Sequence, residues 1–352
     1  MNILERRISR KIKVGNIYIG GDSKISVQSM LNKPASDIQA SVAQAIELEK
    51  AGCEIIRAAV PDKEAVKLIE KLKENVSVPV VADIHFDYRL ALGSLDAGVD
   101  KIRINPGNIG SDERVREVAN ACLRKGVPIR IGVNSGSLEK EILAKHGAPT
   151  AEALVESALH HASLLEKFDF NDIVISIKSS NVATMLKAYE LIAEKCDYPL
   201  HLGVTEAGTH NMALIKSSIG IGSLLMRGIG DTIRVSMTDD PVKEVDAGFD
   251  ILKAAGLKTD CPDLVACPTC GRTKIDLISL ATEVENRLRG CNKPIKVAVM
   301  GCAVNGPGEA READIGIAGG DGCALIFKKG EIVCKVPECE AVDRLMSEIN
   351  NL

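Results

Sequence analysis

The residues best suited to chemistry lie near the end of the chain, in the motif Cys267-Pro268-Thr269-Cys270 and at Cys302. A C-x-x-C pair brings two thiolates to one metal centre, and Cys302 offers a third thiolate about thirty residues later. Clustered thiolates suit zinc or an iron–sulfur cluster. No obvious fourth cysteine or histidine completes a closed zinc site, whereas a weaker oxygen ligand such as Glu309 would leave one iron open. The pattern favours a reactive metal centre, with structural zinc as the alternative.

The segment 301–309 is rich in glycine and contains Pro307. Such a turn allows backbone N–H groups to approach a cluster closely. An ordinary tight turn after a strand is the alternative interpretation.

A second group of polar side chains lies where apolar runs end. Side chains two positions apart share one face of a strand. Four such pairs occur at these ends: Asp83 with His85, Arg103 with Asn105, Ser176 with Lys178, and Arg234 with Ser236. Arg57, Arg130, Asn134 and Glu206 stand at comparable positions. The carboxyl ends of barrel strands are where active sites are built, so we predict a site there.

The predicted site carries an excess of positive charge. Its acids at equivalent positions are Asp83 and Glu206, and its cations are Arg57, Arg103, Arg130, Lys178 and Arg234. Cations gathered around one opening repel each other and lose hydration, so they require an anion. Planar guanidinium groups suit phosphate oxygens, and several of them suit a diphosphate.

Two further side chains could take part in proton chemistry. His85 could donate to a phosphate or carry a proton, and Glu206 could act as a general acid or orient a hydroxyl. A counter-ion role for Glu206 is equally compatible with the sequence. The remaining histidines are interpreted as surface or helix residues: His146, His160, His161, His201 and His210.

Eight short apolar runs alternate with helical patterns up to about residue 256, which predicts a (β/α)8 barrel. The runs cover residues 25–30, 54–59, 79–84, 101–105, 128–134, 172–178, 200–206 and 232–237. An open doubly wound sheet is the alternative, although no Gly-x-Gly-x-x-Gly follows the first strand. A hairpin at 11–19 precedes the first strand and could plug one end of the barrel.

A segment at 258–268 with two prolines and little periodicity predicts a linker. We therefore expect a barrel domain at 1–257 and a smaller α+β domain at 258–352. The second domain should contain a helix at 274–288 and a final helix after its strands. Those strands are expected at 296–300, 314–318, 324–327 and 332–336.

Composition narrows the class of protein. The 352 residues are 45% hydrophobic but only 3% aromatic, as is typical of aliphatic-rich parallel α/β packing. The net charge of −4 argues against nucleic acid or a membrane as the main partner. Residues 1–13 lack an apolar signal core, and no run reaches the ~18 apolar residues of a membrane span. Reduced cysteines in the cytoplasm are therefore expected.

These motifs together resemble the 4-hydroxy-3-methylbut-2-enyl diphosphate synthase family over nearly the whole chain, in its compact two-domain bacterial form. The resemblance rests on the cysteine motifs, the 301–309 loop and five ordered stretches: Val27-Gln28-Ser29-Met30, Ala82-Asp83-Ile84-His85-Phe86, Arg103-Ile104-Asn105-Pro106-Gly107-Asn108, Gly132-Val133-Asn134-Ser135-Gly136-Ser137 and Gly203-Val204-Thr205-Glu206-Ala207-Gly208.

The resemblance implies specific roles. Cys267, Cys270 and Cys302 would hold a [4Fe–4S] cluster, with Glu309 as the fourth ligand at rest, in a domain of the sulfite-reductase or ferredoxin-like type. Glu206 and Asn305 would face the reacting carbons. The diphosphate of 2-C-methyl-D-erythritol 2,4-cyclodiphosphate would be bound by Arg57, His85, Arg103, Arg130, Lys178, Arg234 and Ser236, supported by Asp83, Asn105 and Asn134.

The resemblance also implies partners. Members of the family form head-to-tail homodimers in which the cluster domain of one chain caps the barrel of the other. A flavodoxin or ferredoxin would supply electrons, since the sequence has no nucleotide-binding motif. Two alternatives stay open: a pterin- or corrinoid-linked transferase, and an iron–sulfur or zinc module that senses rather than catalyses.

Overall fold

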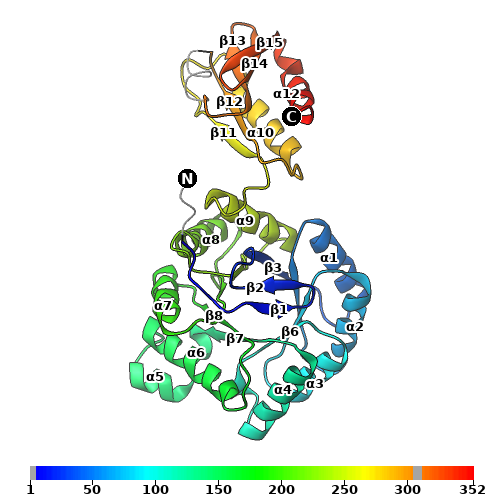
Figure 1. Cartoon of the computed structure of the whole chain (residues 1–352), viewed down its shortest axis with the longest axis vertical. Helices are drawn as coiled ribbons and strands as arrows, with labels where there is room; N and C mark the ends of the chain where they lie inside the picture. Colours follow the sequence, from blue (N-terminus) through cyan, green and yellow to red (C-terminus); the bar gives the residue numbers. More distant parts are fainter. Residues whose placement is uncertain (1–4, 304–310) are drawn as a thin grey trace. The chain divides into compact units, whose positions relative to one another are not determined.

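The computed structural model describes residues 5–303 and 311–352. The chain divides into two compact units, Met1–Ala255 and Gly256–Leu352. The division falls close to the boundary expected after residue 257. Each unit has its own sheet and its own hydrophobic core (Figure 1).

The first unit is an α/β barrel of eight parallel strands. Around the ring the strands follow the order β8-β7-β6-β5-β4-β3-β10-β9, and a parallel bridge between Ile175 and Leu200 joins the two ends. The barrel prediction is confirmed, and the open doubly wound sheet is wrong. The strands are β3 Ser26–Met30, β4 Ile55–Ala59, β5 Val80–Asp83, β6 Lys101–Ile104, β7 Ile129–Asn134, β8 Ile173–Lys178, β9 His201–Leu202 and β10 Thr232–Ile233.

Helices connect the strands and surround the ring (Figure 1). Polar side chains begin several of them: Asp37, Thr150 and Asn181 each accept a backbone N–H of the first helical turn. The helices of this unit are α1 Ile38–Lys50, α2 Val66–Asn75, α3 Tyr88–Asp96, α4 Asp112–Lys125, α5 Lys140–His146, α6 Ala151–Glu166, α7 Val182–Lys195, α8 His210–Leu225 and α9 Pro241–Ala254.

Strands β9 and β10 are shorter than the runs at 200–206 and 232–237 predicted. A β-carbon on Gly203 would lie 2.7 Å from the carbonyl oxygen of Arg234 and 3.0 Å from Lys178 Nζ. The two chain segments therefore leave the regular ladder in close contact, which only a residue without a side chain permits. This contact brings Lys178 and Arg234 to the same part of the barrel.

The N-terminal hairpin, β1 Ile12–Val14 and β2 Ile17–Ile19, is observed as expected. Figure 1 shows it lying across one end of the barrel. Three hairpin residues and three inward-facing strand residues form one buried apolar cluster: Ile12, Val14, Ile19, Ile55, Val81 and Val174. The hairpin thus covers the amino ends of the strands and leaves the site to the carboxyl ends.

The second unit is α+β, with a five-stranded mixed sheet in the order β11-β12-β13-β14-β15. Strands β11 to β13 are parallel, and β14 and β15 are antiparallel to their neighbours. Strand β11 lies inside the expected linker at 258–268, so that part of the linker prediction is wrong. The elements are β11 Asp263–Ala266, α10 Leu277–Leu288, β12 Lys296–Met300, β13 Ile315–Gly320, β14 Cys323–Lys328, β15 Glu331–Val336 and α12 Ala341–Asn350.

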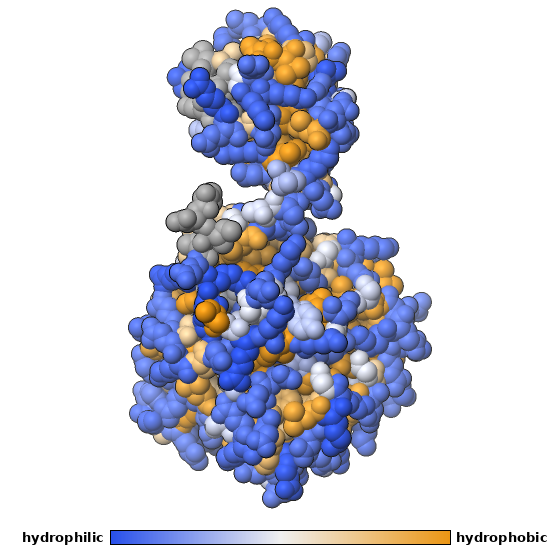
Figure 2. All heavy atoms as spheres, in the orientation of Figure 1, coloured by the Kyte–Doolittle hydropathy of each residue, from blue (hydrophilic) through white to orange (hydrophobic). Residues whose placement is uncertain are grey.

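Hydrophilic residues cover most of both units in the view of Figure 2, with hydrophobic residues in smaller groups. Exposed large apolar side chains include Phe86 in the loop after β5, Ile215 in α8 and Ile278 in α10. Among the described residues no helix combines the length and apolar character needed to cross a bilayer.

Candidate active site and cluster site

The predicted strand-end site centres on Asp83, the last residue of β5. Arg57 Nη2 lies 2.5 Å from Asp83 Oδ2, and Arg103 Nη1 lies 3.1 Å from Asp83 Oδ1. The three residues come from adjacent strands, and Asp83 pairs in register with Arg103. Burial alone would raise the pKa of the Asp83 carboxyl, but the charges of Arg57 and Arg103 hold this pKa well below its usual range. Asp83 is therefore ionised and fixes both guanidinium groups.

Strand β7 supports Arg103 and Asn105 through its backbone at Gly132. Arg103 Nη2 donates to the Gly132 carbonyl oxygen at 2.9 Å, and the Gly132 N–H donates to Asn105 Oδ1 at 3.0 Å. A β-carbon on Gly132 would collide with the Arg103 guanidinium. Glycine at this position thus lets the arginine lie flat against the neighbouring strand.

Three more predicted cations join this group. Arg130 is only 1% exposed, and its Nε and Nη2 atoms have no hydrogen-bond partner within the described residues. Burial lowers the pKa of Lys178 well below its usual range, and the charges of Arg234 and Arg57 lower this pKa further. The charges act on one another in this way because the cations lie near one another, and an anion would offset them.

One counter-ion of the site was not anticipated. Glu244 in the first turn of α9 is buried and lies 3.4 Å from Arg234 Nη2. It also accepts the Met237 N–H at 3.1 Å and the Ser29 hydroxyl at 3.2 Å. The sequence did not indicate that Glu244 is a counter-ion of Arg234, because Glu244 lies on a helix and not at the end of a strand.

The inner barrel holds polar side chains that the sequence reading missed. His201 is fully buried in strand β9, so its interpretation as a surface or helix residue is wrong; its Nδ1 lies 2.8 Å from Thr232 Oγ1. In the described part of the chain, His201 Nε2, Lys101 Nζ and both side-chain polar atoms of Gln28 lack hydrogen-bond partners. Burial, followed by the charges of Arg130 and Arg57, lowers the pKa of Lys101 to about 7.

Lys101→Met is expected to stabilise the protein. Unfolded lysine titrates near ~10.4, so keeping Lys101 buried costs roughly 3–5 kcal/mol below about pH 7. Because its folded pKa is depressed, this cost is complete below the folded pKa and disappears as pH rises toward the unfolded value. The free energies of unfolding in urea of the wild type and Lys101→Met should therefore differ most near neutral pH and become similar at alkaline pH. Equal stability near neutral pH would contradict an unpaired buried lysine.

The other predicted site residues lie at the ends of their strands. His85 Nε2 lies 3.7 Å from Asp83 Oδ2, and the His85 side chain is 58% exposed. Asn134 pairs in register with Lys178, and Ser236 is partly exposed. Glu206 is exposed and has a φ of 51°, a left-handed conformation that costs energy for a side-chain-bearing residue. Among the described residues, no ion pair joins Glu206 to Arg57, Arg103 or Arg234, whose carboxylate partners are Asp83 and Glu244.

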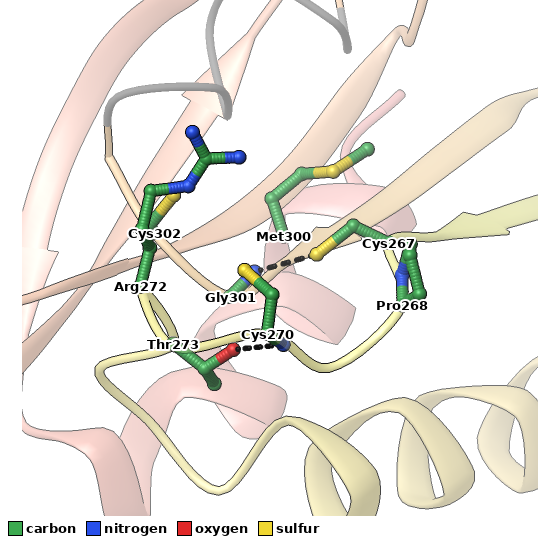
Figure 3. A pocket seen from close by; sticks show the side chains of 8 residues that line it. All are labelled: Cys267, Pro268, Cys270, Arg272, Thr273, Met300, Gly301 and Cys302. Carbon is green, nitrogen blue, oxygen red and sulfur yellow. Dashed lines mark hydrogen bonds between the residues drawn. The ribbon is translucent and has the colours of Figure 1, made fainter.

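The three predicted thiol ligands border one pocket in the second unit (Figure 3). Cys267 follows β11, Cys302 follows β12, and Cys270 lies in the turn before α10. The pocket measures about 190 Å³, far more than the ~10–15 Å³ needed for one water molecule. It therefore has room for a polyatomic group.

Hydrogen bonds prepare these sulfur atoms to act as ligands. The Gly301 N–H donates to Cys267 Sγ at 3.1 Å. Hydrogen bonds from Arg272 and its positive charge lower the pKa of Cys270, which favours the thiolate that binds metals. By contrast, burial raises the pKa of Cys53 and of Cys122 to about 12, as expected for core cysteines.

The donor set fits an iron–sulfur cluster. In a cluster each thiolate binds its own iron, whereas a single zinc ion needs all its ligands within about 2.3 Å of one point. The three thiols border one pocket with room for a polyatomic group, which is compatible with the first arrangement. Asn305 and Glu309 lie outside the described residues.

Comparisons with known proteins cover both units. Residues 9–249 match the model of the GcpE TIM-barrel domain, and residues 263–351 match that of the GcpE protein C-terminal domain. The 4-hydroxy-3-methylbut-2-en-1-yl diphosphate synthase (flavodoxin) of Clostridium perfringens is 59% identical over 349 residues, which covers 99% of this chain and 100% of that protein. The Clostridium acetobutylicum protein of the same name is 61% identical over 349 residues, with the same coverage of both chains.

Solved structures resemble the barrel. Yersinia pestis dihydropteroate synthase has a TM-score of 0.51 at 15% identity, covering 70% of this chain and 98% of its own. The 3-dehydroquinate dehydratase of Geobacillus kaustophilus HTA426 has a TM-score of 0.51 at 16% identity, with the same coverage. At such identities the likeness concerns the fold alone. With both domain models matched and relatives more than half identical over nearly their whole length, the chain belongs to the 4-hydroxy-3-methylbut-2-en-1-yl diphosphate synthase (flavodoxin) family.

Proposed function

We propose that the chain reductively opens 2-C-methyl-D-erythritol 2,4-cyclodiphosphate and releases water to give 4-hydroxy-3-methylbut-2-enyl diphosphate. The reaction consumes two electrons and converts a cyclic diphosphate into an open one with more negative charge. The observation that carries the proposal is the buried excess of cations around Asp83, in a chain that also gathers three thiols around one pocket.

The barrel residues bind and stabilise the diphosphate in this proposal. Asp83 holds Arg57 and Arg103 in place, so their remaining N–H groups are oriented before the substrate arrives. Arg130, Lys178 and Arg234 supply further positive charge, and exposed His85 donates to an outer oxygen. When the ring C–O bond breaks, these fixed cations stabilise the charge that develops on the diphosphate. Asn105, Asn134 and Ser236 complete the polar surroundings.

Lys178 has a specific part in this scheme. Burial and the charges of Arg234 and Arg57 lower its pKa in the free site. A bound diphosphate would offset the neighbouring charges, so substrate binding should raise this pKa and favour the ammonium form.

Cys267, Cys270 and Cys302 would hold a [4Fe–4S] cluster, with Glu309 as a displaceable fourth ligand. Such a cluster, when bound, supplies single electrons and a Lewis-acidic iron. Glu206 and Asn305 are proposed to contact the reacting carbons. The left-handed backbone at Glu206 supports this role, because strained conformations concentrate at functional sites.

The proposal includes a cytoplasmic homodimer in which the cluster domain of one chain serves the barrel of the other. It is motivated by the division of anion binding and thiol ligands between two compact units. Flavodoxin is the proposed electron donor, as the printed names of the relatives indicate for those proteins. Ferredoxin is the alternative donor.

The test is turnover by anaerobically purified holoprotein with reduced flavodoxin and the cyclic diphosphate. Lys178→Met should lower kcat/KM by about 100-fold, because one fixed charge on the anion is lost. Lys125→Met is the matched control, since Lys125 pairs with Asp96 on exposed helices. Wild-type protein with full iron content and no turnover would reject the proposal and favour a sensing module.

A further inference from the structure

We infer that His161 is a positioning residue that fastens the loops after β6 and β7 to helix α6, and that this fastening sets the affinity of the barrel for diphosphates. The inference rests on the proposed function, since it concerns the same anion site. His161 lies in helix α6, one of the two placements expected for it, and its side chain is buried there, with 2% exposed.

Both ring nitrogens of His161 are used. The Gly107 N–H donates to His161 Nδ1 at 3.1 Å, so this nitrogen is an acceptor without a proton. His161 Nε2 lies 2.6 Å from Glu139 Oε1 and must carry the hydrogen, because a carboxylate oxygen only accepts. The two neighbours together select the neutral imidazole protonated on Nε2. We call Gly107, Glu139 and His161 the loop clamp.

Glu139 is suited to hold this position. Burial alone would raise the pKa of the Glu139 carboxyl, but the hydrogen bond from His161 and that of its own backbone bring the pKa to about 2. The Ser157 hydroxyl, one helical turn from His161 on α6, donates to the Glu139 carboxylate at 2.8 Å. The carboxylate thus stays ionised and is held from two positions of the same helix.

The clamp acts directly beside the anion site. Gly107 lies two residues after Asn105, and Glu139 follows the β7 loop that begins at Asn134. Strands β6 and β7 are already joined at Gly132 by bonds to Arg103 and Asn105. The clamp adds side-chain hydrogen bonds outside the ladder, which link both loops to helix α6.

Space at the clamp is tight as well. A β-carbon on Gly107 would lie 2.8 Å from His161 Cε1, so the loop backbone packs against the ring edge. The imidazole therefore fixes both the distance and the orientation of the Asn105–Asn108 turn.

The clamp predicts a change in anion affinity. His161→Leu removes both hydrogen bonds and should weaken binding of inorganic diphosphate to the holoprotein roughly tenfold. Isothermal calorimetry measures this without turnover. KM for the cyclic diphosphate should rise with little change in kcat. His161→Gln, whose amide can accept and donate in similar places, should restore much of the affinity.

A matched control separates positioning from general stability. Tyr198→Phe removes a 2.6 Å hydrogen bond to Glu166, the last residue of α6, from a residue that precedes β9. It should lower stability and leave diphosphate affinity unchanged. Hydrogen exchange at the Gly107 amide should rise in His161→Leu and remain normal in Tyr198→Phe.

The outcomes are distinguishable. If His161→Leu fails to fold, His161→Asn, which keeps an acceptor for Gly107 and cannot reach Glu139, provides the comparison and should bind diphosphate more weakly than His161→Gln. Wild-type affinity in folded His161→Leu or His161→Asn would overturn the clamp while leaving the proposed function intact. Absence of diphosphate binding in the wild type would instead count against the proposed function.

Discussion

Cys302→Ser is expected to abolish iron binding and turnover together. Cys302 is 8% exposed and borders the pocket with Cys267 and Cys270. A serine hydroxyl is far less acidic than a thiol and does not supply the thiolate that iron–sulfur clusters require. Mutation of residues that support metal ligands typically lowers metal affinity or activity about 10- to 100-fold. Loss of a ligand itself should have a larger effect, so activity should fall by more than about 100-fold. Iron and sulfide content per chain and visible absorbance provide the measurements.

Cys291→Ser is the matched control for this experiment. Cys291 is partly buried in the same unit and does not line the thiol pocket. Its replacement should leave iron content and turnover near those of the wild type. A Cys302→Ser protein that retains full iron and activity would show that the proposed ligand set is wrong.

Asp83→Asn is expected to lower both stability and activity strongly. The change leaves Arg57 and Arg103 buried without their shared counter-charge, among further cations. Breaking a buried pair from one side typically costs about 3–5 kcal/mol. Because the folded pKa of Asp83 is depressed, its stabilisation is present above an unfolded pKa of about 3.9 and is lost as pH falls through the folded pKa. Urea unfolding at neutral and at strongly acidic pH should therefore show that the wild type exceeds Asp83→Asn in unfolding free energy, and that this excess becomes smaller in acid.

Inorganic diphosphate provides a second measurement for Asp83→Asn. An anion in the site would compensate the unpaired guanidinium groups, so it should recover part of the lost stability. Asp100→Asn is the control, since Asp100 pairs with Lys73 at 2.6 Å and lies at the other end of β6. Asp100→Asn should lower the free energy of unfolding by less than Asp83→Asn does, and diphosphate should not restore it. Equal losses of unfolding free energy in the two variants would contradict the central role of Asp83.

The strand-end cations could be predicted from two general rules. Strands alternate their side chains with period two, and barrels bring all strand ends to one rim, so Arg103 and Lys178 could be placed before any coordinates. The thiol pocket could also be predicted, because two cysteines at the spacing of Cys267 and Cys270 can reach one metal site whatever the rest of the fold.

Other features depend on contacts that local patterns do not encode. Strand β11 is short, lies between prolines and exists through its pairing with β12, so its residues read as a linker. His161 and His201 look alike in sequence, yet each has a partner determined by packing: Glu139 for one and Thr232 for the other. The sequence indicates only that Lys101 is a polar residue at the start of a strand. Its amine is buried because the strands close into a barrel around it.

The N-terminal hairpin determines how charge can reach the barrel interior. Ile12, Val14 and Ile19 pack against inward-facing strand residues, so the amino ends of the strands are closed by apolar side chains. Water and ions are therefore excluded from that side of the barrel interior, and the buried amine of Lys101 has no aqueous surroundings to stabilise its charge there.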